Sequence, residues 1–239
     1  YTFSSSEAGT ITYGDSCSSS TISAVSGNNT ITLVSLSDGA YSDCTITVTD
    51  NSSNSATLNI SSFVVDTTAP TVSSVSSSTD NGSYKINDNI TVTVTFNDNV
   101  TVDNSSGNPR IQLETGATDQ YALFSAGNAT DELIFTYQVV AGDNSTDLDY
   151  KATGSLDLNS GTIRDLAGND AVLTLASPGA SNSLGHNKAL VIDTTAPTVT
   201  ISGLSTKSGY PATGPGPRGS SRGKACRREW TRPSASSQQ

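Results

Sequence analysis

The chain has 239 residues, of which 33% are hydrophobic and 6% aromatic, and it contains no Met. Its net charge of −10 is uneven: residues 1–205 hold 21 of the 22 acidic residues, whereas residues 206–239 hold 7 of the 12 basic ones. An acidic body disfavours nucleic acid and anionic membranes as partners. No apolar run approaches the roughly 20 residues that span a bilayer, which excludes membrane insertion by a helix. Because Tyr1 is not a translation start, we expect a piece of a longer protein.

One segment occurs twice and sets the expected domain boundaries. Residues 66–72 read Asp-Thr-Thr-Ala-Pro-Thr-Val, and residues 193–199 repeat these seven letters. Each copy, called the connector below, follows an apolar β-branched run and precedes another. Proline fixes φ and favours extended geometry in the residue before it. A repeat at a fixed spacing indicates an array of similar modules, so the connector predicts a module boundary.

Residues 1–66 predict a β-sandwich module that has lost its opening strand, because sandwich domains usually need about 100 residues. Alternating apolar and polar residues, typical of half-buried strands, occur at 9–13, 29–33, 44–49 and 58–65. Cys44 shares strand parity with Ile46 and should face the core. Cys17 and Cys44 are expected to form a disulfide, as is common in exported proteins. The alternative is one buried thiol and one surface thiol.

Residues 67–193 predict a complete module. Its clearest strand is 90–96, with even positions facing inward, and the other expected strands are 110–114, 120–124, 132–139, 155–158 with 162–163, 171–175 and 188–192. Clusters of Gly, Asn, Asp and Ser separate them, as turns require. We see no convincing amphipathic helix, so the fold class is all-β, with two packed antiparallel sheets.

A hairpin turn near the end of each module supports a common origin. Both turns have the form Asp-x-x-x-Asn, at Asp50–Asn54 and at Asp165–Asn169. Turn formation by the Asp and Asn side chains is a sufficient explanation. Residues 194–205 read as the start of a third module. Residues 206–239 change charge sign and lose all alternation, and we expect a disordered or artefactual basic tail.

The connector, the Asp-x-Ala-Gly-Asn turn at 165–169 and the Thr-Val-Thr-Val-Thr-Phe strand resemble tandem bacterial immunoglobulin-like repeats, including cadherin-like ones. The resemblance covers residues 1–205 and implies tandem Ig-like antiparallel β-sandwiches in a large extracellular or cell-surface bacterial adhesin. It implies a non-catalytic spacer whose partners are the neighbouring repeats. A host-surface or glycan ligand would bind elsewhere in the full protein. Asn51-Ser52-Ser53 departs from the usual turn sequence, so a different turn is expected there.

Calcium is the expected ligand, because several carboxylates from different loops should meet at each module junction and Ca²⁺ prefers such oxygens. Placing the loops by sandwich topology groups Asp38, Asp66, Asp98, Asp165, Asn169 and Asp170 at the first junction. It groups Asp143, Asp147, Asp149 and Asp193 at the second. The alternative is a solvated acidic surface with Asx turns.

No constellation for catalysis is visible. The single His186 lies in a Gly-Asn-Lys context with no nucleophile nearby in sequence, and no phosphate loop or serine-hydrolase motif occurs. We therefore expect no enzyme. The alternative function is a carbohydrate-binding or spacer module appended to a secreted hydrolase. Exposed aromatics would favour carbohydrate binding, but most of Tyr84, Tyr121, Phe124, Tyr137 and Tyr150 fall on inward or mid-strand positions.

Overall fold

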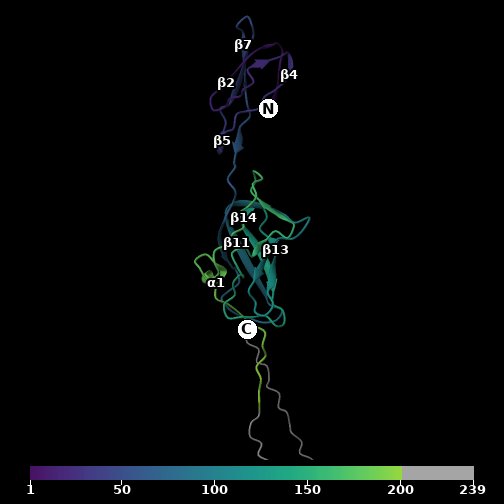
Figure 1. Cartoon of the computed structure of the whole chain (residues 1–239), viewed down its shortest axis with the longest axis vertical. Coiled ribbons are helices and arrows are strands. Elements are labelled where there is room, and N and C mark those ends of the chain that lie inside the picture. Colours follow the sequence, from purple (N-terminus) through teal and green to yellow (C-terminus); the bar gives the residue numbers. More distant parts are fainter. Residues whose placement is uncertain (201–239) are drawn as a thin grey trace, which may run out of the picture. The chain divides into compact units, whose positions relative to one another are not determined.

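The computed structural model describes residues 1–200 (Figure 1), and expectations for residues 201–239 lie outside them. The all-β class is confirmed, with mainly antiparallel sheets. Residues 1–196 form one compact unit, and residues from Pro197 on belong to a second. Within the first unit the buried apolar side chains form two separate cores, one from residues 3–60 and one from residues 75–192. Below, the N-terminal module means residues 1–66 and the central module residues 67–193.

The N-terminal module contains eight strands. They are β1 (Thr2–Ser5), β2 (Gly9–Gly14), β3 (Ser23–Ala24), β4 (Gly27–Thr30), β5 (Gly39–Tyr41), β6 (Thr45–Thr49), β7 (Ser55–Asn59) and β8 (Phe63–Val65). Strands β3, β2, β6 and β7 form one sheet in that order, while β1 pairs with β4 and β5 with β8. Cys44 is buried, as its parity predicts. Residues 31–33, expected in a strand, lie outside β4.

The central module contains ten strands and one helical turn. They are β9 (Val72–Ser76), β10 (Gly82–Tyr84), β11 (Asn89–Asp103), β12 (Arg110–Leu113), β13 (Gln120–Ala126), β14 (Thr130–Gln138), β15 (Asn144–Ser145), β16 (Leu156–Asp157), β17 (Thr162–Arg164), α1 (Leu184–Asn187) and β18 (Leu190–Asp193). The large sheet runs β16-β12-β13-β14-β11-β17, and β9 also pairs with β11. The second sheet is β10-β18-β15.

Strand β11 organises the central core. Ile90, Val92, Val94 and Phe96 are at most 2% exposed, which confirms the inward even positions. The strand continues to Asp103 across an irregularity after Thr95, where Val100 still pairs with Thr130 of β14 and Thr101–Asp103 pair with β17. One strand thereby joins two parts of the sheet. Among the described residues, no helix is long and apolar enough to cross a membrane.

The expected strand at 171–175 is wrong. Within it only Val172 makes a bridge, an isolated parallel one to Thr71. Apolar and polar residues alternate there, but Val172 is exposed. The expected difference between the two Asp-x-x-x-Asn turns is also wrong. Asn54 and Asn169 each donate backbone and side-chain N–H groups to the Asp four residues earlier, and Ser53 adopts a positive φ as Gly168 does.

Candidate functional site

The first connector is hydrogen-bonded to the loop before β5. The Asp38 carboxylate accepts hydrogen bonds from the Thr67 backbone N–H at 2.9 Å, the Thr67 hydroxyl at 2.8 Å and the Thr68 hydroxyl at 2.6 Å. The hydroxyls of Thr68 and Thr67 hold the pKa of Asp38 below its usual value. The register explains the placement, because Gly39 pairs with Val65, so that Asp38 comes opposite Asp66.

The second connector is held in a related way. Asn144 pairs with Asp193 at the end of β15 and β18, the same position that Asp38 has relative to Asp66. Its side-chain oxygen accepts hydrogen bonds from the Thr194 backbone N–H at 3.3 Å and the Thr195 hydroxyl at 3.2 Å. In both copies the second Thr donates its backbone N–H to the connector Asp. An amide thus occupies in one copy the position that a carboxylate occupies in the other.

The first connector also bonds to the central module. The Asn169 side-chain amide donates to the Asp66 carbonyl at 3.1 Å, and the Val172 N–H donates to the Pro70 carbonyl at 2.8 Å. Asn97 exchanges two bonds with Thr71, one through its side-chain oxygen and one through its backbone N–H. Pro70 is buried as a result. This segment is therefore anchored along its length and is not a free linker.

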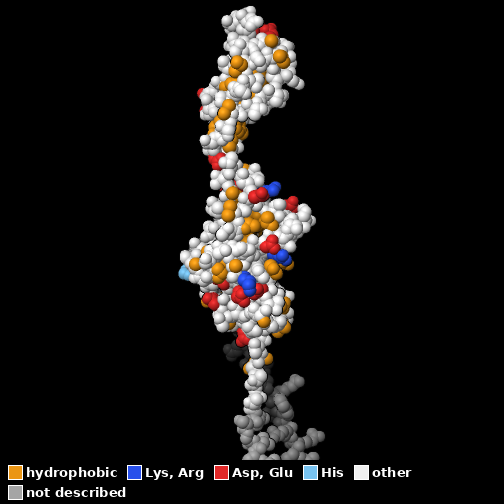
Figure 2. All heavy atoms as spheres, viewed as in Figure 1, with side chains coloured by type: hydrophobic (Ala, Val, Ile, Leu, Met, Phe, Trp, Pro, Cys, Tyr) orange, Lys and Arg blue, Asp and Glu red, His pale blue; other side chains and the backbone are white. Residues whose placement is uncertain are grey.

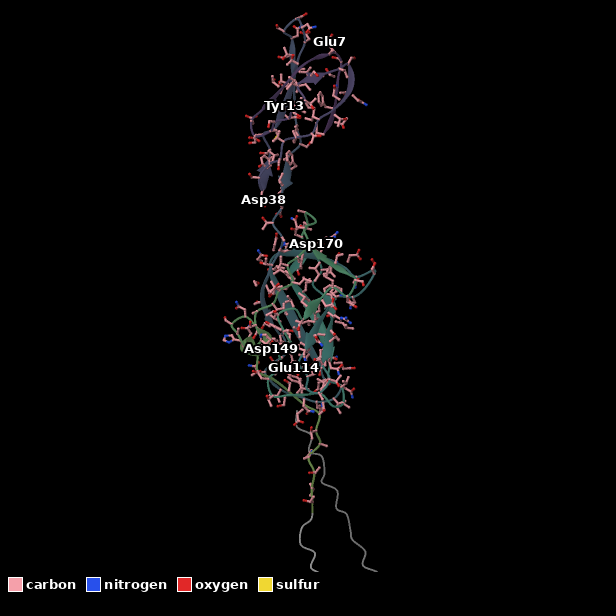
Figure 3. All side chains as sticks on the ribbon, viewed as in Figure 1. Glu7, Tyr13, Asp38, Glu114, Asp149 and Asp170 are labelled. Carbon is pink, nitrogen blue, oxygen red and sulfur yellow. A yellow bond between two sulfur atoms is a disulfide. The ribbon has the colours of Figure 1, made fainter. Side chains whose placement is uncertain are left out.

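Of the six residues expected at the first junction, the structure joins Asp165, Asn169 and the Asp66 carbonyl. Burial raises the pKa of Asp165, but the hydrogen bonds donated by Asn169 and Gly168 outweigh it and the pKa lies below its usual value. Asp170 instead forms an ion pair with Arg164 at 2.6 Å. Asp98 is exposed and accepts a bond from the Asn99 N–H. Figure 3 shows Asp170 at one end of the central module, away from Asp149 and Glu114.

The four residues expected at the second junction have separate roles. Asp143 is buried and accepts hydrogen bonds from the Tyr137 hydroxyl at 2.5 Å, the Val140 N–H at 2.9 Å and the Gln120 amide at 3.2 Å. Burial, and then this carboxylate, raise the pKa of Tyr137 far above its usual value. Asp149 accepts from the backbone of Tyr150 and Gly179, while Asp147 is exposed and Asp193 bonds Thr195.

The hydrogen bonds of these carboxylates decide how well they could bind calcium. Across residues 1–200, no three or more His, Cys, Asp or Glu side chains are grouped so that they could hold a metal ion. The oxygens of Asp38, Asp143 and Asp165 accept hydrogen bonds from the protein itself. The arrangement as it stands does not fit a multidentate calcium site, and calcium binding stays a prediction.

The disulfide joins Cys17 and Cys44, whose Cα atoms lie 5.2 Å apart, and both residues are buried. It links the segment before β3 to the start of β6 inside the smaller core. No cysteine occurs in the central module. The two modules therefore differ in how their cores are held together.

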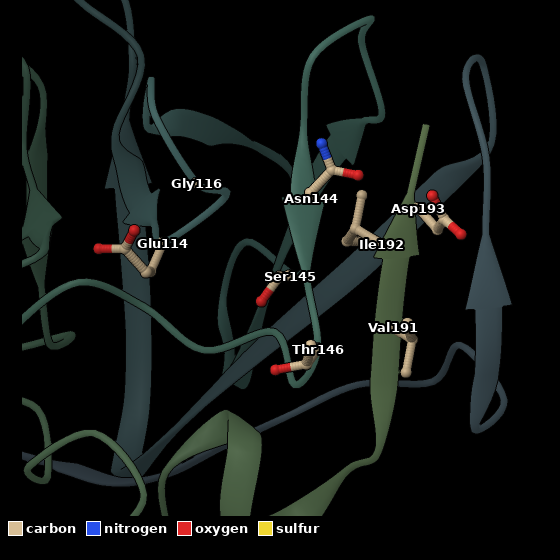
Figure 4. A pocket seen from close by; sticks show the side chains of 8 residues that line it. All are labelled: Glu114, Gly116, Asn144, Ser145, Thr146, Val191, Ile192 and Asp193. Carbon is tan, nitrogen blue, oxygen red and sulfur yellow. The ribbon is translucent and has the colours of Figure 1, made fainter. Parts of the chain in front are cut away.

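A shallow hollow beside β15 and β18 is a further concave feature. Its lining consists of Glu114, Gly116, Asn144, Ser145, Thr146, Val191, Ile192 and Asp193. Figure 4 shows Glu114 on one side of it and Asn144 with Ile192 on the other. His186 is exposed on α1 and lies outside this lining. The hollow is bordered by two carboxylates, two hydroxyls and aliphatic carbon.

Sequence reasoning missed Asn97, Asn144 and the paired threonines of each connector. The two threonines of each connector are visible in the repeat. Their hydrogen-bond partners are not, because the partner is Asp38 before Gly39 in one copy and Asn144 after Asp143 in the other. Only strand register identifies Asp38 and Asn144 as equivalent. Figure 2 shows the acidic side chains on the visible face spread out, several of them beside Lys or Arg.

Comparison with protein families gives a match to part of the chain. No curated protein and no solved structure shows significant similarity to the chain. Residues 66–178 match the family model described as a bacterial Ig-like domain, a non-catalytic family. The match begins at Asp66 in the first connector and covers β9 to β17. Residues 66–178 are therefore similar to bacterial Ig-like domains.

Proposed function

We propose that this chain is a non-catalytic spacer made of Ig-like repeats in an extracellular bacterial surface protein of the adhesin type. A spacer must connect modules through segments that resist bending, and it needs no ligand pocket of its own. The Ig-like match supports a structural role for the central module. The observation that carries the proposal is the connector, which occurs twice and is hydrogen-bonded by equivalent residues in both copies.

The first connector differs from a flexible linker in its composition and its hydrogen bonds. Polar linkers of Gly and Ser behave as random coils. The first connector instead contains a proline and accepts or donates hydrogen bonds at Asp66, Thr67, Thr68, Pro70 and Thr71. Each hydrogen bond contributes only about 0.5–1.5 kcal/mol to stability, but together these bonds restrict the backbone of residues 66–71. A restricted connector supports the proposed role as a spacer.

The test is a distance distribution measured by electron spin resonance between labels at Val25→Cys and Leu123→Cys, both exposed positions, with Cys226→Ser to remove the third cysteine. A narrow distribution is expected, and Asp38→Ala with Asn169→Ala should broaden it. Labels at Leu123→Cys and Leu166→Cys, both in the central module, serve as the control and should not change. A broad distribution in the parent chain would contradict the spacer role.

The proposal also includes calcium binding at the module junctions. Neutralising the carboxylates near the connectors would reduce their repulsion and stiffen the junctions further. Titration calorimetry with Ca²⁺, compared with EDTA, tests this idea on the whole chain. Heat of binding that is lost in Asp165→Asn would support the junction site. Absence of heat together with an unchanged melting temperature would end the calcium proposal and leave the spacer role intact.

The alternative role, a carbohydrate-binding or spacer module of a secreted hydrolase, has one observation in its favour. Tyr121 is 39% exposed on β13, and the Arg110 guanidinium lies 4.3 Å from its ring centroid. Tyr137 and Tyr150, by contrast, are buried in the central core. A platform for sugars needs several exposed rings in a row, so a single one gives weak support to this role.

A further inference from the structure

One Asn-Gly pair occurs in the sequence, at Asn81 and Gly82. It lies where β10 begins, at the edge of the second sheet, beside the parallel strand β18. Asn81 and Gly82 are both exposed, so water reaches the side-chain amide and the peptide bond that follows it. An asparagine before a glycine is the arrangement in which the next backbone nitrogen attacks the side-chain amide most readily, because glycine has no Cβ to obstruct the approach.

Two hydrogen bonds place the groups that would react on the same side of the chain. The Asn81 side-chain oxygen accepts a hydrogen bond from the Ala189 N–H at 3.0 Å, and the Gly82 N–H donates to the Ala189 carbonyl at 3.1 Å. Both partner groups belong to one residue. The Asn81 Cγ, which would be attacked, and the Gly82 nitrogen, which would attack it, therefore face the same short segment of chain.

The Ala189 N–H also favours the attack electrostatically. As the Gly82 nitrogen bonds to the Asn81 Cγ, negative charge develops on the side-chain oxygen of Asn81. A backbone N–H that points at an oxygen where charge develops stabilises the transition state, as in an oxyanion hole. Here the donor already points at that oxygen before the reaction begins.

Exposed asparagines elsewhere in the central module lack this combination. Asn104 and Asn144 are exposed too, but each precedes a serine, whose Cβ crowds the approach of the backbone nitrogen. The Asn144 side-chain oxygen is also engaged by the second connector, through Thr194 and Thr195. Asn104 therefore serves as a comparison within the same chain.

We propose that Asn81 is a site of spontaneous deamidation. The Gly82 nitrogen loses its proton and attacks the Asn81 Cγ, the bond from Cγ to the side-chain nitrogen breaks, and that nitrogen takes up a proton and leaves as ammonia. Water then opens either carbonyl of the resulting succinimide ring, which gives aspartate or isoaspartate at position 81. The overall reaction consumes one water and releases one ammonia. It is independent of the spacer role.

The isoaspartate product changes the edge of the second sheet. Its main chain runs through the side-chain carbon of residue 81, and the added methylene displaces the Gly82 N–H from the Ala189 carbonyl. Ala189 comes directly before β18, which ends at Asp193 in the second connector. Deamidation thus adds a negative charge and loosens the pairing of β10 with the strand that leads to this connector.

The test is peptide mapping by mass spectrometry after incubation of the whole chain at mildly alkaline pH. Asn81 should gain the mass difference between an amide and a carboxylic acid, whereas Asn104 should stay unmodified over the same period. Conversion should be slower at mildly acidic pH, because the Gly82 N–H must lose its proton. If Asn81 stayed unmodified for as long as Asn104, the proposal would be overturned.

Gly82→Ala is the matched control. A Cβ at this position meets no heavy atom within 4 Å, and Gly82 does not adopt a positive φ, so the fold should be unchanged. The added methyl group obstructs the attacking nitrogen, so that conversion of Asn81 should be strongly slowed. Equal rates in the parent and in Gly82→Ala would overturn the proposal, because the reaction would then not pass through the succinimide.

NMR spectra test the structural consequence. In Asn81→Asp a carboxylate still accepts the Ala189 N–H, so the Gly82 and Ala189 amide signals should stay near their parent positions. In incubated chain these signals should move in proportion to the isoaspartate content, which is measured with an endoproteinase that cleaves before aspartate but not before isoaspartate. Unmoved signals in a chain rich in isoaspartate would contradict the loosening of β10.

Discussion

The N-terminal module encloses eight buried apolar or cysteine residues, whereas the central module encloses 22, within residues 1–200. The smaller core contains the disulfide, and the larger core contains Val75 from β9. Apolar burial contributes roughly 25 cal/mol per Å², so the smaller core contributes less to stability than the larger one. In the N-terminal module the disulfide adds a covalent link between distant segments.

Both modules are built from mainly antiparallel strands, but their cores are stabilised in two ways. In the central module side-chain packing dominates, and in the N-terminal module the link between Cys17 and Cys44 takes a larger share. The two asparagine turns and the two connectors are nearly the same in both.

The largest effect should come from the central core. Phe135 is fully buried and packs edge-on against Phe124 at a centroid distance of 5.9 Å. Phe135→Ala should lower the free energy of unfolding of the central module by about 3–5 kcal/mol, through lost burial and a cavity. Thermal unfolding followed by near-ultraviolet circular dichroism measures it. Leu123→Ala, at a 47% exposed site, should change little, and an equal loss in both would contradict the packing argument.

Removing the disulfide should have the next largest effect, confined to the N-terminal module. The cysteines are 27 residues apart, and opening a loop of this length costs roughly 3–4 kcal/mol in the chain-entropy model. In the double variant Cys17→Ser with Cys44→Ser, the native NMR signals of the Ile11 and Ile46 amides should disappear at a lower urea concentration than in the parent chain. The native signals of the Val92 and Phe135 amides should disappear at the same urea concentration as in the parent chain. A shift shared by both modules would show that the disulfide also supports the central core.

A smaller loss is expected at Asp143. Replacing it with Ala leaves the buried Tyr137 hydroxyl and the Val140 N–H without their acceptor, and an unpaired buried donor costs about 1–3 kcal/mol. We expect about 2–3 kcal/mol from chemical denaturation. Asp147→Ala, four residues on and exposed, is the control and should stay within about 0.5 kcal/mol. Similar losses at both positions would imply a shared ion site instead of a buried hydrogen-bond network.

A substitution in the Asp50–Asn54 turn of the N-terminal module should increase its stability. Ser53 has a φ of 68°, the left-handed region that Gly168 occupies in the equivalent turn. Glycine adopts this region without the steric cost that a side chain pays. Ser53→Gly should stabilise the N-terminal module by about 0.5 kcal/mol after the added freedom of the unfolded chain is counted. The reciprocal Gly168→Ser should destabilise the central module, and a gain there would contradict the equivalence of the turns.

The smallest effect is local and depends on pH. Because the folded-state pKa of Asp38 is lowered, its hydrogen bonds to Thr67 and Thr68 are fully present above the unfolded pKa, near 4. They are lost as pH falls through the folded pKa. The amide of Thr67 should therefore shift at acid pH in NMR spectra, while that of Thr194, bonded to the uncharged Asn144, should not. Asp38→Asn should abolish the pH response of Thr67, and a response that persists would assign it to another group.

The sequence predicted the fold class and the best core strand because those features depend on periodicity. Ile90, Val92 and Val94 alternate with threonines, and burial follows. It did not reveal β9, where Ser73-Ser74 interrupts the apolar pattern, or β1 and β5, which are short. The candidate site was only partly predictable. For Asp165 the Asp-x-x-x-Asn spacing indicated the turn in which Gly168 and Asn169 are its donors. For Asp143 no spacing in the sequence displays its partners, which are the Tyr137 hydroxyl, the Val140 N–H and the Gln120 amide.

Calorimetric unfolding of the whole chain, with and without a reductant, tests most directly the claim that two modules with separate cores make up residues 1–193. We predict two transitions, of which the reductant lowers only the one that belongs to the N-terminal module. A single cooperative transition that moves as a whole on reduction would contradict the claim.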